Sequence, residues 1–335
     1  MKATKKYGNL RNTPYEKNID EIWNILELFP KSCRKLFLKN LKTLIIENVP
    51  KKELEMIAED GAAEGIYIPD CNTIYLNKTT KYKHAILNHE LIHATSSSEN
   101  RRGIIGTFEL GPNIISIGNN LEEGITEYLA LKSVNKEKTH TGYHIEVFVI
   151  KCLTDIYGDK ILIPYFKKKE ENFYKQFNRY REIIIKIDLL LKRLSNYIDI
   201  TDIFEEYLLL KELNPKVLKE NNLYIESTEI PILAKHLINN QKIINKLYEK
   251  EEKTNKKIIP NEPYEIIKPE NIDIYKEWYK KEKDLLNEII KRIIILGRIN
   301  KLSDQLIKEI IVNNLKHSDE TLEVIKYHNK KLIRK

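Results

Sequence analysis

The chain has few cysteines and no long apolar run. Its three cysteines, Cys33, Cys71 and Cys152, are far apart among 335 residues, and none lies in a C-x-x-C pair. This pattern is typical of reduced thiols and argues against a disulfide framework or a cysteine-based metal site. No stretch of about 18 apolar residues occurs, so we expect no membrane span.

The sequence also lacks the features of an exported or nucleic-acid-binding chain. The first 15 residues are polar and basic, without the apolar core of a signal peptide, and we therefore expect a cytoplasmic protein. The net charge of +8 would suit a nucleic-acid partner. Lysine and glutamate are interleaved almost everywhere, however, which is typical of solvated helix faces. We expect no nucleic-acid partner.

Glycine is scarce in the second half, where Gly297 is the only one after Pro164. The pattern there predicts one helix after another, with breaks at prolines. The first half instead mixes short β-branched stretches, turns and helices. We therefore predict an α+β fold, with a small mixed sheet at residues 17–165 and an all-helical domain at residues 166–335.

Periodicity and turn residues predict the elements within each domain. In the first domain we expect helices at 20–29, 31–40, 81–96, 121–133 and 142–157, a strand at 41–49, a helix or loop at 51–59, and hairpins at 65–76 and 107–117. In the second domain we expect helices at 171–194, 201–213, 228–252, 273–298, 303–316 and 319–330. Asn119 or Asn120 is expected to cap the helix at 121–133. The strand at 73–77 is either an edge strand that would pair with a substrate backbone or an internal strand.

One short stretch carries most of the functional information. Residues 89–93 read His-Glu-Leu-Ile-His, an H-E-x-x-H motif, within the helix predicted at 81–96. Histidines four positions apart lie on one face of a helix, so His89 and His93 can bind one metal ion, and neutral imidazole suits Zn²⁺. Glu90 would be held beside the same ion, where it can act as a general base on a bound water.

A catalytic zinc site needs a third protein ligand and one open position. The stretch at 121–128 is the clearest source, because it begins a predicted helix and offers three carboxylates, Glu122, Glu123 and Glu127. From the residues alone, any of these three carboxylates can be the third ligand.

Taken together, the two stretches resemble the gluzincin metallopeptidases, the thermolysin-like and zinc aminopeptidase group. The matching residues are His89, Glu90, His93, Glu123, Gly124 and Glu127. The resemblance covers about residues 80–130 and implies a zincin-like catalytic domain with one Zn²⁺. It also implies that Glu123 is the third ligand and that Glu127 is the carboxylate that orients His89.

The chain departs from the family pattern at two points. The family often has Asn at the position of Glu122, and Gly124 directly after Glu123 favours Glu123 as the ligand. The aminopeptidase motif G-x-M-E-N is absent, which favours an endopeptidase.

Peptidases of this class also need a donor for the oxyanion. Tyr143 and His144 begin the helix predicted at 142–157, and either one can fill this role. The alternative for each is an ordinary residue at the start of a packed helix.

The sequence therefore predicts a zinc metallopeptidase that hydrolyses a peptide or protein substrate. The alternative is a non-catalytic helical interaction or sensing protein that keeps a zincin fold with a structural or vestigial zinc. An open coordination position would favour the enzyme, and a fourth protein ligand would favour the structural site.

Overall fold

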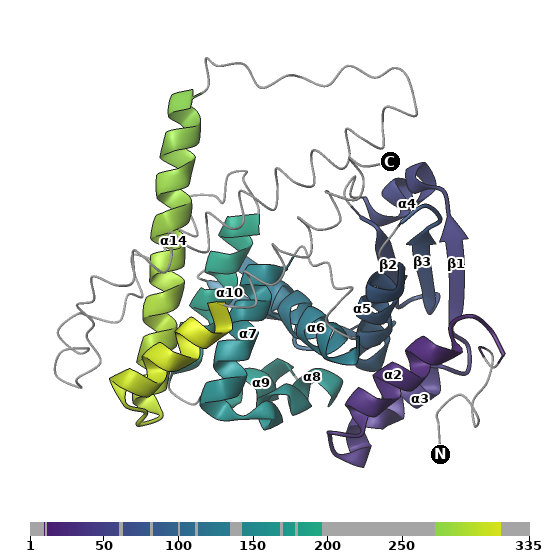
Figure 1. The fold of residues 1–335 in the computed structure, drawn as a ribbon, viewed down its shortest axis with the longest axis horizontal. Helices are drawn as coiled ribbons and strands as arrows, with labels where there is room; N and C mark the ends of the chain where they lie inside the picture. Colours follow the sequence, from purple (N-terminus) through teal and green to yellow (C-terminus); the bar gives the residue numbers. More distant parts are fainter. Residues whose placement is uncertain are drawn as a thin grey trace, which may run out of the picture. The chain divides into compact units, whose positions relative to one another are not determined.

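The computed structural model describes residues 10, 12–59, 63–80, 83–99, 101–110, 113–134, 143–167, 170–177, 180–195 and 272–315. The described part is mixed α/β and largely helical (Figure 1). The chain divides into two compact units, Met1–Asp188 and Leu189–Lys335. The domain limits predicted at 17–165 and 166–335 stay a prediction.

The first unit contains most of the described elements. Its helices are α2 Glu16–Leu26, η1 Lys31–Arg34, α3 Lys35–Asn40, α4 Lys51–Ala58, α5 Lys83–Ser96, α6 Asn119–Ser133, α7 His144–Tyr157, η3 Asp159–Leu162, α8 Ile163–Lys167, α9 Glu170–Lys175 and the start of α10 Arg181–Ser195. Its strands are β1 Ile45–Val49, β2 Gly65–Ile68, β3 Thr73–Asn77, β4 Ser97–Ser98, β5 Arg101–Arg102, β6 Gly106–Leu110 and β7 Asn113–Ile117. Both predicted hairpins are present, but the helix predicted at 171–194 is broken into α9 and α10.

The largest described sheet has the strand order β1-β3-β2. β3 pairs in parallel with β1, where Ile45 faces Thr73, and antiparallel with β2, where Gly65 faces Leu76. Of the two interpretations of 73–77, the structure has the internal strand, because β1 pairs along one side of β3 and β2 along the other. The two edges of this sheet are β1 and β2.

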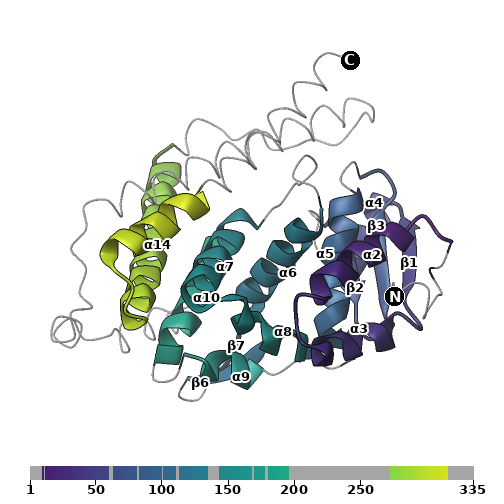
Figure 2. The ribbon, with the colours of Figure 1, turned by 60° about the horizontal axis from the view of Figure 1, so that its bottom comes forward.

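Helix α5 lies against this sheet and is covered on its other sides by further helices. It contacts β2 and β3 on one side and α2, α3 and α6 elsewhere, and every residue from Leu87 to Ser96 is buried. α6 lies between α5 and α7 (Figure 2). Gly124 allows the close approach of α6 and α7, since a Cβ there would lie 3.0 Å from Cβ of Glu146 and from Cγ1 of Ile150.

The start of α6 differs from the prediction. Its N-cap is Gly118, and Asn119 and Asn120 lie inside the helix, so the prediction that one of them is the cap is wrong. Asp188, on α10, accepts the hydrogen bonds that a capping side chain would take. A local sequence pattern cannot predict an acceptor that lies about 70 residues away.

In the second unit the described residues form helical structure. It holds the end of α10, helix α14 Ile272–Ile299 and a helix at 304–315. A Cβ at Gly297 would lie 2.6 Å from Cγ1 of Ile307, so glycine lets these last two helices approach closely. The helices predicted at 201–213, 228–252 and 319–330 lie outside the described residues. Among the described helices, none is long and apolar enough to cross a membrane.

Candidate metal centre

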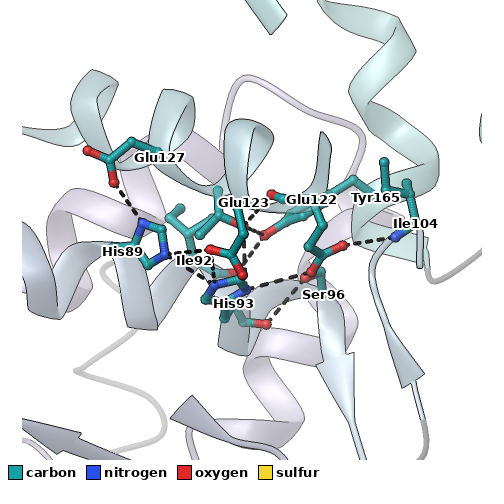
Figure 3. Close-up of polar contacts among 10 residues, drawn as sticks. His89, Ile92, His93, Ser96, Ile104, Glu122, Glu123, Glu127 and Tyr165 are labelled. Carbon is teal, nitrogen blue, oxygen red and sulfur yellow. Dashed lines mark hydrogen bonds and ion pairs between the residues drawn. The ribbon is translucent and has the colours of Figure 1, made fainter. Parts of the chain in front are cut away.

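Helix α5 holds the two motif histidines side by side. The Nε2 atoms of His89 and His93 lie 3.2 Å apart, and both rings are almost completely buried. Spacing by four residues explains this arrangement, because it places both side chains on one helix face. Figure 3 shows both rings pointing toward α6.

Helix α6 brings Glu123 to both rings. Its Oε2 lies 3.2 Å from Nε2 of His89 and 3.3 Å from Nε2 of His93. The three donor atoms thus form a nearly equilateral triangle. A tetrahedral ion with bonds of about 2.0 Å requires donor atoms about 3.3 Å apart, so the three side chains fit such an ion. Among the described residues, no fourth His, Cys, Asp or Glu joins this group.

Each histidine has a partner on its other nitrogen. Nδ1 of His89 donates to Oε2 of Glu127 over 2.7 Å. This bond keeps the proton on Nδ1, so Nε2 is the nitrogen that can bind a metal ion once it has lost its own proton. Nδ1 of His93 lies 3.4 Å from Oγ1 of Thr126, which in turn lies 2.8 Å from the hydroxyl of Tyr165.

Glu122 faces away from the three donor atoms. It is fully buried, with one carboxylate oxygen 3.6 Å from Nδ1 of His93 and the other accepting the N–H of Ile104 at 3.0 Å. Gly103 leaves the room for this carboxylate, because a Cβ there would collide with it. The geometry therefore brings Glu123, and not Glu122, to both Nε2 atoms.

The charges of this cluster are strongly coupled. Burial alone would lower the pKa of His89, but hydrogen bonds with Glu123 and Glu127 hold it well above 6.5. Burial would also lower the pKa of His93, but the neighbouring carboxylates, Glu123 above all, raise it to about 9. Burial would raise the pKa of Glu123, yet the two imidazoles hold it well below 4.5. The three pKa shifts therefore favour a negatively charged Glu123 beside positively charged imidazoles.

Glu90 lies beside the same rings and next to the sheet edge. Burial raises the pKa of its carboxyl group, while His89, His93 and a backbone hydrogen bond from Tyr67 oppose that rise. A Cβ at Gly65 would lie 3.3 Å from Oε1 of Glu90. Glu90 thus sits against β2, and burial holds the pKa of its carboxyl group above the ordinary value.

Beside Glu90, β2 has backbone groups that do not bond to β3, and one of them, the Tyr67 N–H, donates to Glu90. The Asn77 N–H donates to the Glu64 carbonyl, so residues 64, 66 and 68 bond toward β3. Because antiparallel partners alternate, the N–H and C=O groups of Gly65 and Tyr67 point away from β3. These are the positions beside Glu90.

The two candidate oxyanion donors lie in different surroundings. The ring of Tyr143 stacks on His89, with centroids 5.5 Å apart and an angle of 11° between the planes, and 37% of the residue is exposed. The Glu123 carboxylate, burial and Glu90 raise the pKa of its phenol well above 10, so the hydroxyl keeps its proton. His144 is 1% exposed on α7. The catalytic roles of both residues stay predictions.

Sequence reasoning missed three residues of the surroundings. Thr126 and Tyr165 form a hydroxyl chain behind His93, and Asp188 binds the start of α6. Thr126 lies three residues after Glu123, a spacing that places it near the same helix face. Neither Tyr165 nor Asp188 has a comparable signal in the sequence.

Comparison with known proteins adds no assignment. The chain matches no protein-family model, no curated protein and no solved structure.

Proposed function

We propose that this chain is a zinc-dependent metallopeptidase, in which His89, His93 and Glu123 hold the ion. The observation that carries the proposal is the triangle of donor atoms, with edges of 3.2, 3.2 and 3.3 Å. Two imidazoles and a carboxylate are a donor set that zinc favours, and three protein ligands leave a fourth position for catalysis. The resemblance to the gluzincins rests on these same residues.

A bound zinc ion would lower the pKa of a coordinated water to about 7 and polarise the carbonyl of the scissile bond. The remaining steps belong to side chains of this chain. Glu90 takes the proton of the attacking water and returns it to the leaving amine. Tyr143 donates its phenolic proton in a hydrogen bond to the oxyanion, because its hydroxyl stays protonated at neutral pH. Glu127 holds His89 in the tautomer that binds metal.

The substrate that fits this arrangement is an extended peptide segment. The N–H and C=O groups of Gly65 and the C=O group of Tyr67 point away from β3 and can pair with a peptide backbone, as in strand addition. The Tyr67 N–H donates to Glu90 instead. Such pairing would hold a peptide bond beside Glu90. With no aminopeptidase motif G-x-M-E-N in the chain, we propose an endopeptidase.

The experiment is zinc analysis combined with a peptide-library digest. The purified full chain should contain close to one zinc per molecule and should cleave library peptides, and Glu90→Gln should keep the zinc and cleave them far more slowly. A chain that takes up no zinc after supplementation would contradict the proposal. A chain that holds zinc in four protein ligands and cleaves nothing would instead support a structural ion in a non-catalytic interaction protein.

A further inference from the structure

Helix α6 carries a metal ligand but has no cap of its own. Its N-cap is Gly118, which has a φ of +89° and no side chain to accept the first N–H groups of the helix. A Cβ at this position would lie 2.7 Å from the Ile104 carbonyl oxygen and 2.8 Å from the Tyr174 hydroxyl. A serine or aspartate therefore does not fit here, and the free N–H groups need an acceptor from elsewhere.

Asp188 supplies that acceptor from α10. One of its carboxylate oxygens accepts the Gly118 N–H at 2.6 Å, and the other accepts the N–H groups of Asn120 and Leu121 at 3.1 and 3.0 Å. Asp188 is 1% exposed. A buried carboxylate with three backbone donors at the positive end of a helix dipole binds that helix end strongly.

The capped end lies within one turn of the metal ligand. Glu123 follows Leu121 by two residues, and its carboxylate oxygen meets the two imidazoles at 3.2 and 3.3 Å. The place of that oxygen therefore depends on where α6 begins along its own axis. Functional groups have to be held within about 0.5 Å of the productive geometry, which is less than the rise of one helical residue.

We propose that Asp188 is a positioning residue of the metal centre: by capping α6 it sets where Glu123 stands relative to His89 and His93. This inference rests on the proposed zinc site. It adds a residue that lies 65 positions after the third ligand and in neither of the two motifs.

The test compares Asp188→Ala and Asp188→Asn with a cap removed elsewhere. Ser303 is the matched control, because its hydroxyl accepts the Leu306 N–H at 3.2 Å at the start of the helix at 304–315. The readouts are the zinc dissociation constant, measured against a chromophoric chelator, and the visible absorption spectrum of the Co²⁺-loaded full chain. A cap that is only structural would change the melting temperature and leave both readouts unchanged.

For Asp188→Ala we expect the zinc dissociation constant to rise by about 10- to 100-fold, as for other residues that orient ligands. The Co²⁺ bands should shift in the same variant. Asp188→Asn should lie between this variant and the wild type, because its amide oxygen still accepts a hydrogen bond. Ser303→Ala should change neither the dissociation constant nor the spectrum.

Zinc affinity within about twofold of the wild type in the Asp188 variants would overturn the inference. Should Asp188→Ala show no cooperative melting, Asp188→Asn decides the outcome by itself. Because neither readout depends on turnover, the two proposals fail separately. Unchanged affinity in a chain that cleaves peptides overturns only the role of Asp188, and weakened affinity in a chain that cleaves nothing supports that role and overturns the peptidase.

Discussion

Glu127 and Glu123 contact the same imidazole on opposite nitrogens. Oε2 of Glu127 lies 2.7 Å from Nδ1 of His89, and Oε2 of Glu123 lies 3.2 Å from Nε2 of that ring. The contact with Glu127 orients the ring, whereas Glu123 and Nε2 of the ring both face the proposed metal position. Substitution of each carboxylate should therefore have a different effect on zinc binding.

Glu123→Gln should abolish tight zinc binding, because the change removes one of three ligands and its charge. Glu127→Gln should keep zinc but weaken its affinity by about 10- to 100-fold, because an amide orients the imidazole less strongly than a carboxylate. Zinc titration against a competing chelator measures both. Glu122→Gln should keep stoichiometric zinc, since its carboxylate reaches neither Nε2 atom and lies only near Nδ1 of His93, at 3.6 Å. Loss of stoichiometric zinc in this variant would contradict the assignment of Glu123.

Glu90→Gln should lower kcat by about 10²- to 10⁴-fold, the usual contribution of a general base. Zinc content should stay at the level of the wild type, because Glu90 is not a ligand in the proposed site. Turnover of a library-derived peptide and metal analysis of the same preparation check this. Loss of zinc together with turnover would show that Glu90 supports the metal instead of acting on water.

Tyr143→Phe should lower kcat by about 10²-fold or more, with a small change in KM, because an oxyanion donor acts in the transition state. Phenylalanine keeps the ring that stacks on His89 and removes only the hydroxyl. Steady-state kinetics of the variant, together with its zinc affinity, test this prediction. A kcat equal to that of the wild type would remove Tyr143 from the mechanism and leave His144 as the candidate to test.

Stability without metal should fall as the pH rises from 6.5 toward 9. The pKa of His93 is about 9 in the fold against 6.5 as the ordinary value. A group whose pKa is raised by folding stabilises the fold below its unfolded pKa, and this contribution is lost as the pH rises through the folded value. The lowered pKa of Glu123 acts in the other direction and costs stability only in acid, below 4.5.

Zinc affinity should show the opposite trend and increase with pH over the same range, because each histidine must lose its proton to bind the ion. Urea unfolding in the presence of a chelator at pH 6 and pH 8.5 checks the stability, and zinc titration at pH 6, 7 and 8 checks the affinity. His93→Gln serves as the reference for the first measurement. A difference between wild type and His93→Gln that does not shrink with pH would contradict the pKa shift.

The two histidines could be placed from the sequence because their relation is local. A spacing of four residues on a helix brings two side chains to one face, and the structure has the Nε2 atoms of His89 and His93 3.2 Å apart. Glu123 was predicted as the third ligand only through the resemblance to the gluzincins, because the residues alone did not distinguish it from Glu122. In the structure the two glutamates differ because Gly103 leaves room for the Glu122 carboxylate and the Ile104 N–H binds it there, away from the donor atoms.

The features that were missed depend on contacts between distant segments. β3 is a central strand because β1 pairs along it, which no pattern within 73–77 can show. The acceptor at the start of α6 is Asp188, on α10, about 70 residues further along the chain. Tyr143 and His144 are neighbours in sequence, yet Tyr143 is the N-cap of α7 and His144 its first residue, so their side chains leave the backbone in different directions.

The close approach of the Glu122 carboxylate to Gly103 predicts that the residues at these two positions covary. Gly103, with a φ of +30°, has no side chain, and the Glu122 carboxylate fills the space that a Cβ would need. In related chains we therefore expect glycine at the first position wherever glutamate occupies the second. A chain with the shorter asparagine at the second position would free that space. Covariation of this pair would identify relatives that share the buried carboxylate.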